Sequence, residues 1–266
     1  MTTPTWCPGC GNFGIWAAFK NACLENKWNK DNTVMVAGIG CHGHIVNFVD
    51  MTFFEGLHGR AIPVATGIKI VRQTSNVFVF TGDGDCLGEG GNHFIHSCRR
   101  NHDLTILLHD NAVYGLTTGQ TSPLSPCGYV SKSTPDGNLD NPINPVALAI
   151  ISGATFVARA YSTDIPYLTQ LIKQANDHHG LSVIDILQPC TTFNKDYTHQ
   201  FFQSNSYYLD ETYNPTNKIK ALEKSLEWIP NKIPLGIVYK EDRFANDRTL
   251  DLKQPIVRDI SKLFNS

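Results

Sequence analysis

Side chains that can bind metals or phosphates follow four short β-branched runs of this 266-residue chain. In an open α/β sheet, ligands bind at the carboxyl ends of the strands. If the four runs are neighbouring parallel strands, the residues behind them lie at one edge of the sheet and can share a site. Those residues are 38–44, 82–85, 110–115 and 188–190, and they include cysteines, histidines, carboxylates and an amide.

The turn Gly82-Asp83-Gly84-Asp85 has the composition of a site for an anionic ligand held through a cation. Its glycines let the backbone approach phosphate oxygens, and the helix expected next would point its N-terminus at them. Asp83 supplies a carboxylate oxygen, the type of ligand that Mg²⁺ prefers. Alone, this tetrapeptide is more typical of an ordinary tight turn, so its weight depends on partners elsewhere in the chain.

Four of the eight cysteines could meet at the same edge. Cys7 and Cys10 are close enough to share one tight turn, and Cys41 and Cys190 each follow an expected strand. Four thiolates bind either a structural zinc ion or an iron–sulfur cluster, and spacing alone leaves both open because the contiguous ferredoxin spacing is absent. Cys23 and Cys98 are expected outside the site, as buried apolar residues of helices.

Composition and charge exclude several other classes of protein. Hydrophobic residues make up 41% of the chain and charged residues 17%, as in folded rather than disordered proteins. The net charge of −2, without a basic run, gives no reason to expect a nucleic-acid partner. Apolar stretches are too short to span a bilayer, and the first residues show no export signal. We therefore expect a cytoplasmic protein without a membrane partner, in which disulfides are disfavoured.

The elements that must position these residues alternate along the chain. Runs at 33–37, 77–81, 105–109, 155–160 and 182–187 predict buried strands. The helical pattern at 165–178 has Asp164 as a possible N-cap and Gly180 just beyond its end. The alternation predicts an α/β fold with a mostly parallel sheet and helices on both faces. The other expected helices cover residues 13–25, 43–50, 62–71, 89–100 and 145–152.

Two segments depart from this alternation. Residues 111–144 lack clear periodicity, and a loop of that length in a compact domain is usually functional or disordered. From about residue 195 the chain is richer in Tyr, Asn and Lys, with one amphipathic helix expected at 216–228 and a strand at 235–239. We therefore divide the chain into a main domain, residues 1–194, and a C-terminal extension, residues 195–266, that packs on the main domain or on a partner.

The distance from the Gly82 turn to Asn111 resembles that in the thiamine diphosphate motif. There a Gly-Asp-Gly turn precedes a helix, a strand and a pair of Asn residues, and here 26 residues separate Gly84 from Asn111. The resemblance implies a Mg²⁺ site made of the Asp83 and Asn111 side chains and the backbone carbonyl of Val113. The chain departs from the motif at Asp110, where the first Asn is expected, which affects a supporting interaction rather than an implied metal ligand.

Over roughly residues 4–194 the chain resembles the β subunits of archaeal and bacterial 2-oxoacid:ferredoxin oxidoreductases. The matching segments, in the same order, are residues 6–11, 38–41, 58–61, 82–85, 110–117, 119–123 and 189–190. The resemblance implies that Cys7, Cys10, Cys41 and Cys190 bind a four-iron, four-sulfur (4Fe-4S) cluster. Cys86 and Cys127 fall outside the matching cysteine positions and are expected to be structural or incidental. It also implies a thiamine diphosphate site that involves Gly40, Cys41, His42, Gly82, Asp83, Gly84, Asp85, Asn111, Val113, Gly115, Leu116 and Thr117.

Other residues in or near the matching segments are candidates for the substrate site. Arg60 could hold a substrate carboxylate with two hydrogen bonds, with His58 beside it, although a structural ion pair is the commoner role for a single Arg. His42 and His44 either line the pocket or support it from outside. Residues 117–122 are expected to close over the cofactor.

The resemblance implies the oxidative decarboxylation of a 2-oxoacid, 2-oxoglutarate or pyruvate, to an acyl-coenzyme A and CO₂. Electrons would pass through the cluster to ferredoxin. Thiamine enzymes also need a Glu that tautomerises the aminopyrimidine, normally on a second domain, whereas Glu55 and Glu89 both fall in the diphosphate-binding domain. We therefore expect a larger α subunit to carry the pyrimidine-binding domain and much of the substrate and coenzyme A sites, and the isolated chain to be inactive.

Two other functions fit parts of the sequence. A non-redox thiamine diphosphate decarboxylase or synthase subunit would share Asp83 and Asn111 and use the cysteines for structural zinc. A zinc-stabilised binding or regulatory subunit would have a vestigial cofactor site, against which the intact Gly-Asp-Gly turn and Asn111 argue. Iron and sulfide content separates the first function from the oxidoreductase, and thiamine diphosphate binding separates the second.

Overall fold

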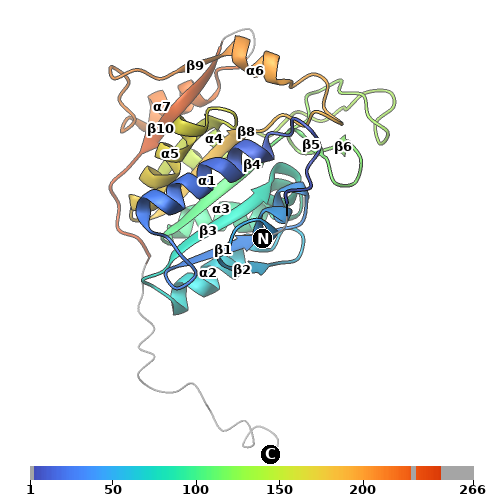
Figure 1. Cartoon of the computed structure of the whole chain (residues 1–266). Coiled ribbons are helices and arrows are strands. Elements are labelled where there is room, and N and C mark those ends of the chain that lie inside the picture. The colour runs from blue at the N-terminus through green and yellow to red at the C-terminus, as the bar shows by residue number, and fades with distance from the viewer. Residues whose placement is uncertain (1–2, 229–231, 247–266) are drawn as a thin grey trace, which may run out of the picture.

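An eight-stranded sheet forms the centre of the structure, a computed structural model that describes residues 3–228 and 232–246 (Figure 1). The strand order is β2-β1-β3-β4-β8-β7-β10-β9. All neighbours are parallel except β7 and β10, so the predicted mostly parallel α/β sheet is confirmed. The strands span Thr33–Ala37 (β1), Thr52–Glu55 (β2), Asn76–Gly82 (β3), Leu104–Asp110 (β4), Phe156–Tyr161 (β7), Leu181–Leu187 (β8), Ser206–Tyr208 (β9) and Ile233–Lys240 (β10).

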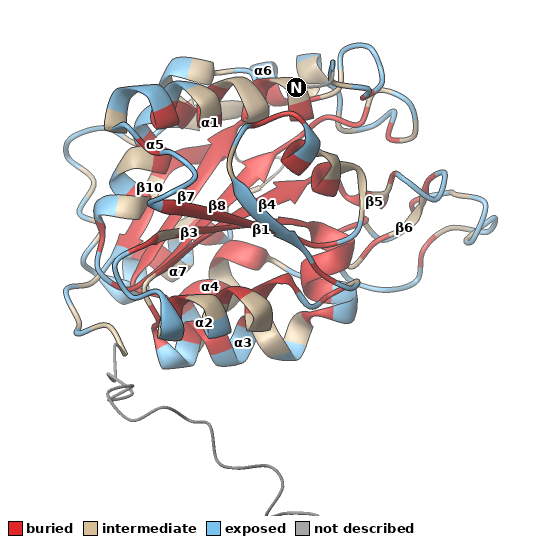
Figure 2. Cartoon of the chain, turned by 60° about the horizontal axis from the view of Figure 1, so that its bottom comes forward, coloured by how far each residue is buried: buried red, intermediate tan, exposed pale blue. Residues whose placement is uncertain are grey.

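Helices cover both faces of this sheet (Figure 2). On one face α1 packs against α5, and on the other α2, α3, α4 and α7 form a second layer. Because both faces are covered, every residue of β1, β4, β7 and β8 is buried. The helices span Asn12–Asn26 (α1), Ala61–Val71 (α2), Gly91–Arg100 (α3), Pro145–Ser152 (α4), Ile165–Asp177 (α5), His199–Asn205 (α6) and Lys218–Ser225 (α7).

Local sequence explains where two of these helices begin. The Asp164 side chain accepts a hydrogen bond from the Tyr167 amide at the start of α5, as predicted. Asn144 does the same for the Ala147 amide at the start of α4, where Pro145 occupies the first helical position and needs no N–H partner. Cys23 and Cys98, expected as apolar helix residues, are buried in α1 and α3.

Several local expectations are wrong. Residues 43–50 do not form an α-helix; instead Cys41–Asn47 is a 3₁₀ helix (η1), because a glycine and two β-branched residues weaken helix propensity there. Helix α3 starts two residues later than expected, after a π-helical segment, Gly84–Glu89 (η2). Strand β2 was not predicted, since all four of its residues are exposed at the sheet edge. The long loop contains a small hairpin of Val113–Tyr114 (β5) and Gln120–Thr121 (β6).

The C-terminal part adds two strands to the sheet. Strand β10 contains the expected strand at 235–239 and pairs with β7, while β9 lies at the outer edge. The helix expected at 216–228 is the shorter α7, capped by Asn217. The boundary between residues 194 and 195 stays a prediction, and residues 1–2, 229–231 and 247–266 lie outside the described residues. Within the described ranges, none of the helices combines the length and apolarity needed to cross a membrane.

Candidate functional site

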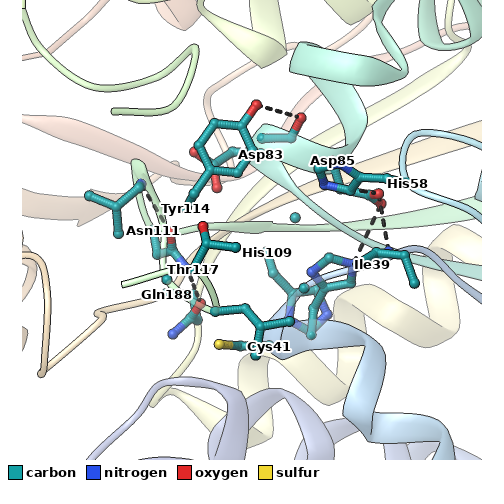
Figure 3. A pocket seen from close by; sticks show the side chains of 17 residues that line it. Ile39, Cys41, His58, Asp83, Asp85, His109, Asn111, Tyr114, Thr117 and Gln188 are labelled. Carbon is teal, nitrogen blue, oxygen red and sulfur yellow. Dashed lines mark hydrogen bonds and ion pairs between the residues drawn. The ribbon is translucent and has the colours of Figure 1, made fainter. Parts of the chain in front are cut away.

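The ends of four neighbouring strands bring the predicted segments together. Strands β1, β3, β4 and β8 are consecutive in the sheet, and their last residues are in register, as Gly82 with His109 and Asp110 with Leu187. The segments behind them surround one pocket (Figure 3). All twelve residues predicted to contact the diphosphate cofactor line it, and their binding role stays a prediction. The lining consists of Ile39, Gly40, Cys41, His42, His58, Gly82, Asp83, Gly84, Asp85, His109, Asn111, Val113, Tyr114, Gly115, Leu116, Thr117 and Gln188.

Asp83 follows β3 directly and is almost completely buried. Its Oδ2 accepts a hydrogen bond from the hydroxyl of Ser122, which reaches in from the long loop. Burial raises the pKa of Asp83 to about 7, although the Ser122 hydroxyl and the backbone amides of Gly84 and Asn111 oppose the rise. A nearby cation would favour the charged form of such a carboxyl, so the surroundings of Asp83 fit a bound Mg²⁺ ion.

The side chain of Asn111 is held in one orientation beside this carboxyl. Its Oδ1 accepts a hydrogen bond from the Val113 amide at 3.0 Å, and its Nδ2 donates to Gln188 Oε1 at 3.0 Å. An amide oxygen has two lone pairs, so Oδ1 retains one for a metal ion. Asp83 and Asn111 therefore offer the carboxylate and amide oxygens that the thiamine diphosphate motif implies.

Asp85 holds the pocket wall together. Its Oδ1 accepts hydrogen bonds from the amides of Gly59 at 2.7 Å and Ile39 at 3.1 Å, and its Oδ2 accepts one from the Thr81 hydroxyl at 2.6 Å. His42 Nε2 lies 3.5 Å from Oδ2. Burial opposes ionisation, but His42, the Gly59 amide and the Thr81 hydroxyl together lower the pKa of Asp85. A charged Asp85 thus ties three separate segments around the pocket.

Tyr114 is a pocket residue that sequence reasoning did not single out, although it lies in the matching segment 110–117. Its ring packs on Gly84, where an added Cβ would be 2.3 Å away, so that glycine is required by the ring. The Tyr114 hydroxyl donates to Glu89 at 3.2 Å. Burial and the negative charge of Glu89 raise the pKa of Tyr114, so the hydroxyl keeps its proton. The Tyr114 proton therefore stays in the bond to Glu89, which holds the ring in the pocket wall.

The two candidate substrate residues lie in different surroundings. His58 lines the pocket, with Nδ1 3.4 Å from Glu89 Oε2 and Nε2 3.7 Å from Asp85 Oδ1. Arg60 is exposed, its Nη1 lies 2.6 Å from His93 Nε2, and it does not line the pocket. The structure therefore brings His58, but not Arg60, to this first pocket.

A second pocket, beside the first, gathers the four predicted cysteine ligands. Cys7, Cys10, Cys41 and Cys190 all line it, as does His44. Burial raises the pKa of Cys10 to about 12 and that of Cys41 to about 11, and neighbouring cysteines of the group add to both shifts. Across residues 3–228 and 232–246, no three Cys, His, Asp or Glu side chains are close enough to hold a single metal ion. Cys86 is buried in the core and Cys127 is exposed, and neither lines this pocket.

The two pockets share a wall. A Cβ added to Gly115 would lie 3.6 Å from Cys190 Sγ and 3.7 Å from Cys41 Sγ, so the loop after β4 runs directly against two of the sulfur atoms. The same loop carries Asn111, which lines both pockets. The residues that line both pockets are Cys41, Asn111, Gly115, Leu116 and Gln188.

Comparisons with known proteins identify the family. The profile of the C-terminal, thiamine-pyrophosphate-binding domain of thiamine pyrophosphate enzymes matches residues 33–186. The profile of the C-terminal part of the pyruvate ferredoxin oxidoreductase beta subunit matches residues 190–252. The 2-oxoacid:ferredoxin oxidoreductase subunit beta of Saccharolobus solfataricus is 43% identical over 275 residues, which cover 96% of this chain and 90% of that protein. The chain belongs to this family of β subunits.

Other members of the family give the same result. The 2-oxoglutarate synthase subunit KorB of Archaeoglobus fulgidus is 43% identical over 192 residues, 72% of each chain. The structure of the 2-oxoglutarate:ferredoxin oxidoreductase from Magnetococcus marinus, with 2-oxoglutarate, coenzyme A and succinyl-CoA bound, is similar with a TM-score of 0.91 and 35% identity. That similarity covers 99% of this chain and 92% of the other. The expected β-subunit family, fold and thiamine-diphosphate-binding domain are therefore confirmed.

Proposed function

We propose that this β subunit binds thiamine diphosphate and Mg²⁺ in the first pocket. The Asp83 and Asn111 side chains and the Val113 carbonyl would hold the metal ion, and the glycine-rich turns around them would admit the diphosphate. The match to a thiamine-pyrophosphate-binding domain supports the cofactor. The buried Asp83 and the fixed Asn111 amide support the metal, because both oxygen-bearing side chains line the same pocket.

We further propose a 4Fe-4S cluster in the second pocket, bound by Cys7, Cys10, Cys41 and Cys190. In such a cluster each thiolate binds a different iron atom, so the four sulfurs need not converge on one point as they would around zinc. Burial holds the Cys10 and Cys41 thiols in the protonated form, and binding to iron would remove their protons.

The shared wall is the observation that supports an oxidoreductase most directly. When bound, thiamine diphosphate supplies the chemistry that decarboxylates a 2-oxoacid, and a cluster accepts electrons one at a time. Gly115 lies against the Cys41 and Cys190 sulfurs, and Asn111 in the same loop is the proposed metal ligand. This chain would thus fix the two groups as neighbours, an arrangement that a non-redox thiamine enzyme does not need.

The proposed reaction is the oxidative decarboxylation of a 2-oxoacid, 2-oxoglutarate or pyruvate, to acyl-CoA and CO₂, with ferredoxin as the electron acceptor. The names of the relatives and the ligands bound in the Magnetococcus marinus enzyme support this class of substrate. His58 would meet the substrate from this chain, and Arg60 could do so only from outside the pocket lining. We propose a cytoplasmic complex.

A larger α subunit would complete the active site. In this chain Glu55 is exposed on the edge strand β2, and Glu89 is bonded to Tyr114 and close to His58. Neither glutamate is among the residues that line the first pocket. The Glu that activates the aminopyrimidine would therefore come from the partner, together with much of the coenzyme A site. The part after residue 194 would pack on the main domain, as β10 does on β7.

Iron and acid-labile sulfide analysis tests this proposal, on protein purified anaerobically with its α subunit. We expect about four of each per β chain. Both should be lost in Cys41→Ala and retained in Cys127→Ala, a matched control because Cys127 is exposed away from the pocket. Stoichiometric zinc without sulfide would contradict the oxidoreductase and favour a non-redox thiamine diphosphate subunit with structural zinc.

A further inference from the structure

The side chain of Gln188 connects the two pockets. Gln188 follows β8 directly, is only 1% exposed and lines both pockets. Its Oε1 accepts the hydrogen bond from Asn111 Nδ2 at 3.0 Å, and its Nε2 donates to Cys10 Sγ at 3.3 Å. One buried amide therefore contacts a proposed magnesium ligand with its oxygen and a proposed cluster ligand with its nitrogen.

The orientation of this amide follows from its neighbours. Asn111 Oδ1 already accepts from the Val113 amide, so the Asn111 group that faces Gln188 is the donor Nδ2, and an acceptor must meet it. At the other end the Pro189 carbonyl, which can only accept, lies 2.9 Å from Gln188 Nε2. A flipped Gln188 would lose both bonds, so its N–H groups point toward Cys10.

The sheet also fixes the backbone of Gln188. Asp110 at the end of β4 is in register with Leu187 at the end of β8, and the Gln188 amide donates to the Asp110 carbonyl at 2.7 Å. Asn111 and Gln188 are the next residues on these paired strands and therefore lie side by side. A substitution at Gln188 would thus change the side-chain bonds without releasing the strand pairing.

We propose that Gln188 is a positioning residue for both cofactor sites, an inference that rests on the function proposed above. Toward the metal, it holds the Asn111 amide so that Oδ1 faces Mg²⁺. Toward the cluster, its N–H group stabilises negative charge on the Cys10 sulfur. Reduction adds negative charge to the cluster, so this hydrogen bond favours the reduced form and makes the reduction potential more positive.

The test is the Gln188→Met variant of the intact complex, which keeps the length of the side chain and removes both hydrogen bonds. We expect full iron and sulfide content, a more negative midpoint potential in an EPR-monitored redox titration, and an affinity for Mg²⁺–thiamine diphosphate about fivefold weaker. Gln170→Met, at an exposed position on α5, is the matched control and should change neither quantity.

A second variant keeps the proposal testable if the methionine disturbs packing. Gln188→Glu retains the volume and an acceptor for Asn111 but cannot offer the amide N–H to Cys10. Pulsed EPR of the reduced cluster after exchange into D₂O should show one exchangeable deuteron fewer in both variants. An unchanged potential and an unchanged deuteron signal in either iron-loaded variant would overturn the role of Gln188. Wild-type protein without iron and sulfide would instead overturn the proposed function, and this inference with it.

Discussion

The hydroxyl of Ser122 donates a hydrogen bond to the carboxylate of Asp83 and so ties the long loop to the proposed metal ligand. The same loop is held independently by Ser125, whose Oγ donates to the Ala112 carbonyl at 2.6 Å and accepts from the Ser122 amide at 2.9 Å. Residues 117–122, expected to close over the cofactor, thus end at a residue that contacts Asp83. Loop position and metal binding should therefore be linked.

Substitution of Ser122 tests this link. Ser122→Ala removes one hydrogen bond to Asp83 while Ser125 still holds the loop, so the affinity of the complex for Mg²⁺–thiamine diphosphate should fall about fivefold. Isothermal titration calorimetry measures the change. Ser133→Ala, at an exposed position of the same loop, should bind like the wild type. Equal affinities for the Ser122 and Ser133 variants would show that the loop does not support the metal ligand.

The raised pKa of Asp83 predicts how the affinity for the metal ion depends on pH. Because its pKa is raised to about 7 without metal, the carboxyl carries a proton at lower pH, and Mg²⁺ must displace that proton. Affinity for Mg²⁺–thiamine diphosphate should therefore fall about tenfold for each pH unit below about 6 and level off above about 8. Titrations across this range measure the slope. Asp83→Asn should bind weakly and without that slope, and a wild type with flat pH dependence would contradict the assignment.

The core strands could be predicted because the fold makes them conspicuous. Parallel strands covered on both faces appear in the sequence as unbroken apolar runs, and Thr33–Ala37 was found with its observed ends. Strand β2 is exposed at an edge and β9 is only three residues long, so neither leaves such a run. The π-helical segment η2 begins within the Asp85 network, whose partners Ile39 and Gly59 are 46 and 26 residues away. Local propensity carries no information about such contacts.

At the site, too, local sequence marks some residues, whereas the contacts of others depend on distant parts of the chain. Asp83, Asn111 and the four cysteines could be predicted to lie at these pockets because a motif or a metal-binding residue type marks them. Residues 188–190 were expected at this edge of the sheet, but the contacts of Gln188 were not, because its partner Cys10 lies 178 residues earlier in the chain. Tyr114 was missed because only the fold places its ring against Gly84. Side chains that position a ligand group are hidden in the sequence when their partners are distant.

Cysteine reactivity tests the geometry of the second pocket in the iron-free chain. Cys127 is exposed, whereas burial and neighbouring thiols raise the pKa of Cys10 to about 12, so Cys10 holds very little thiolate at about pH 8. Iodoacetamide should therefore modify Cys10 more than about tenfold slower than Cys127, as measured by peptide mass spectrometry. Cys98, buried in α3 with its pKa also raised to about 12, is the internal slow control. Equal rates for Cys10 and Cys127 would show that the pocket is open.

Arg159 and Asp185 form a buried ion pair between β7 and β8. Arg159 Nε lies 2.8 Å from Asp185 Oδ2, both side chains are 1% exposed, and the guanidinium lies 5.4 Å from the ring centroid of Trp228. Burial raises the pKa of Asp185 even though the charge of Arg159 opposes that rise. The carboxylate therefore depends on its partner to stay charged within the core.

Arg159→Leu should destabilise the chain by about 3–5 kcal/mol, because it leaves Asp185 buried without a counter-charge. Lys173→Leu is the matched control: Lys173 Nζ lies 2.6 Å from Glu25 Oε2 in a more exposed pair, and its loss should cost less than about 1 kcal/mol. Differential scanning calorimetry of the two variant complexes compares these costs. A melting temperature for Arg159→Leu as high as that of the control would mean that Asp185 takes up a proton, or finds another donor, without loss of stability.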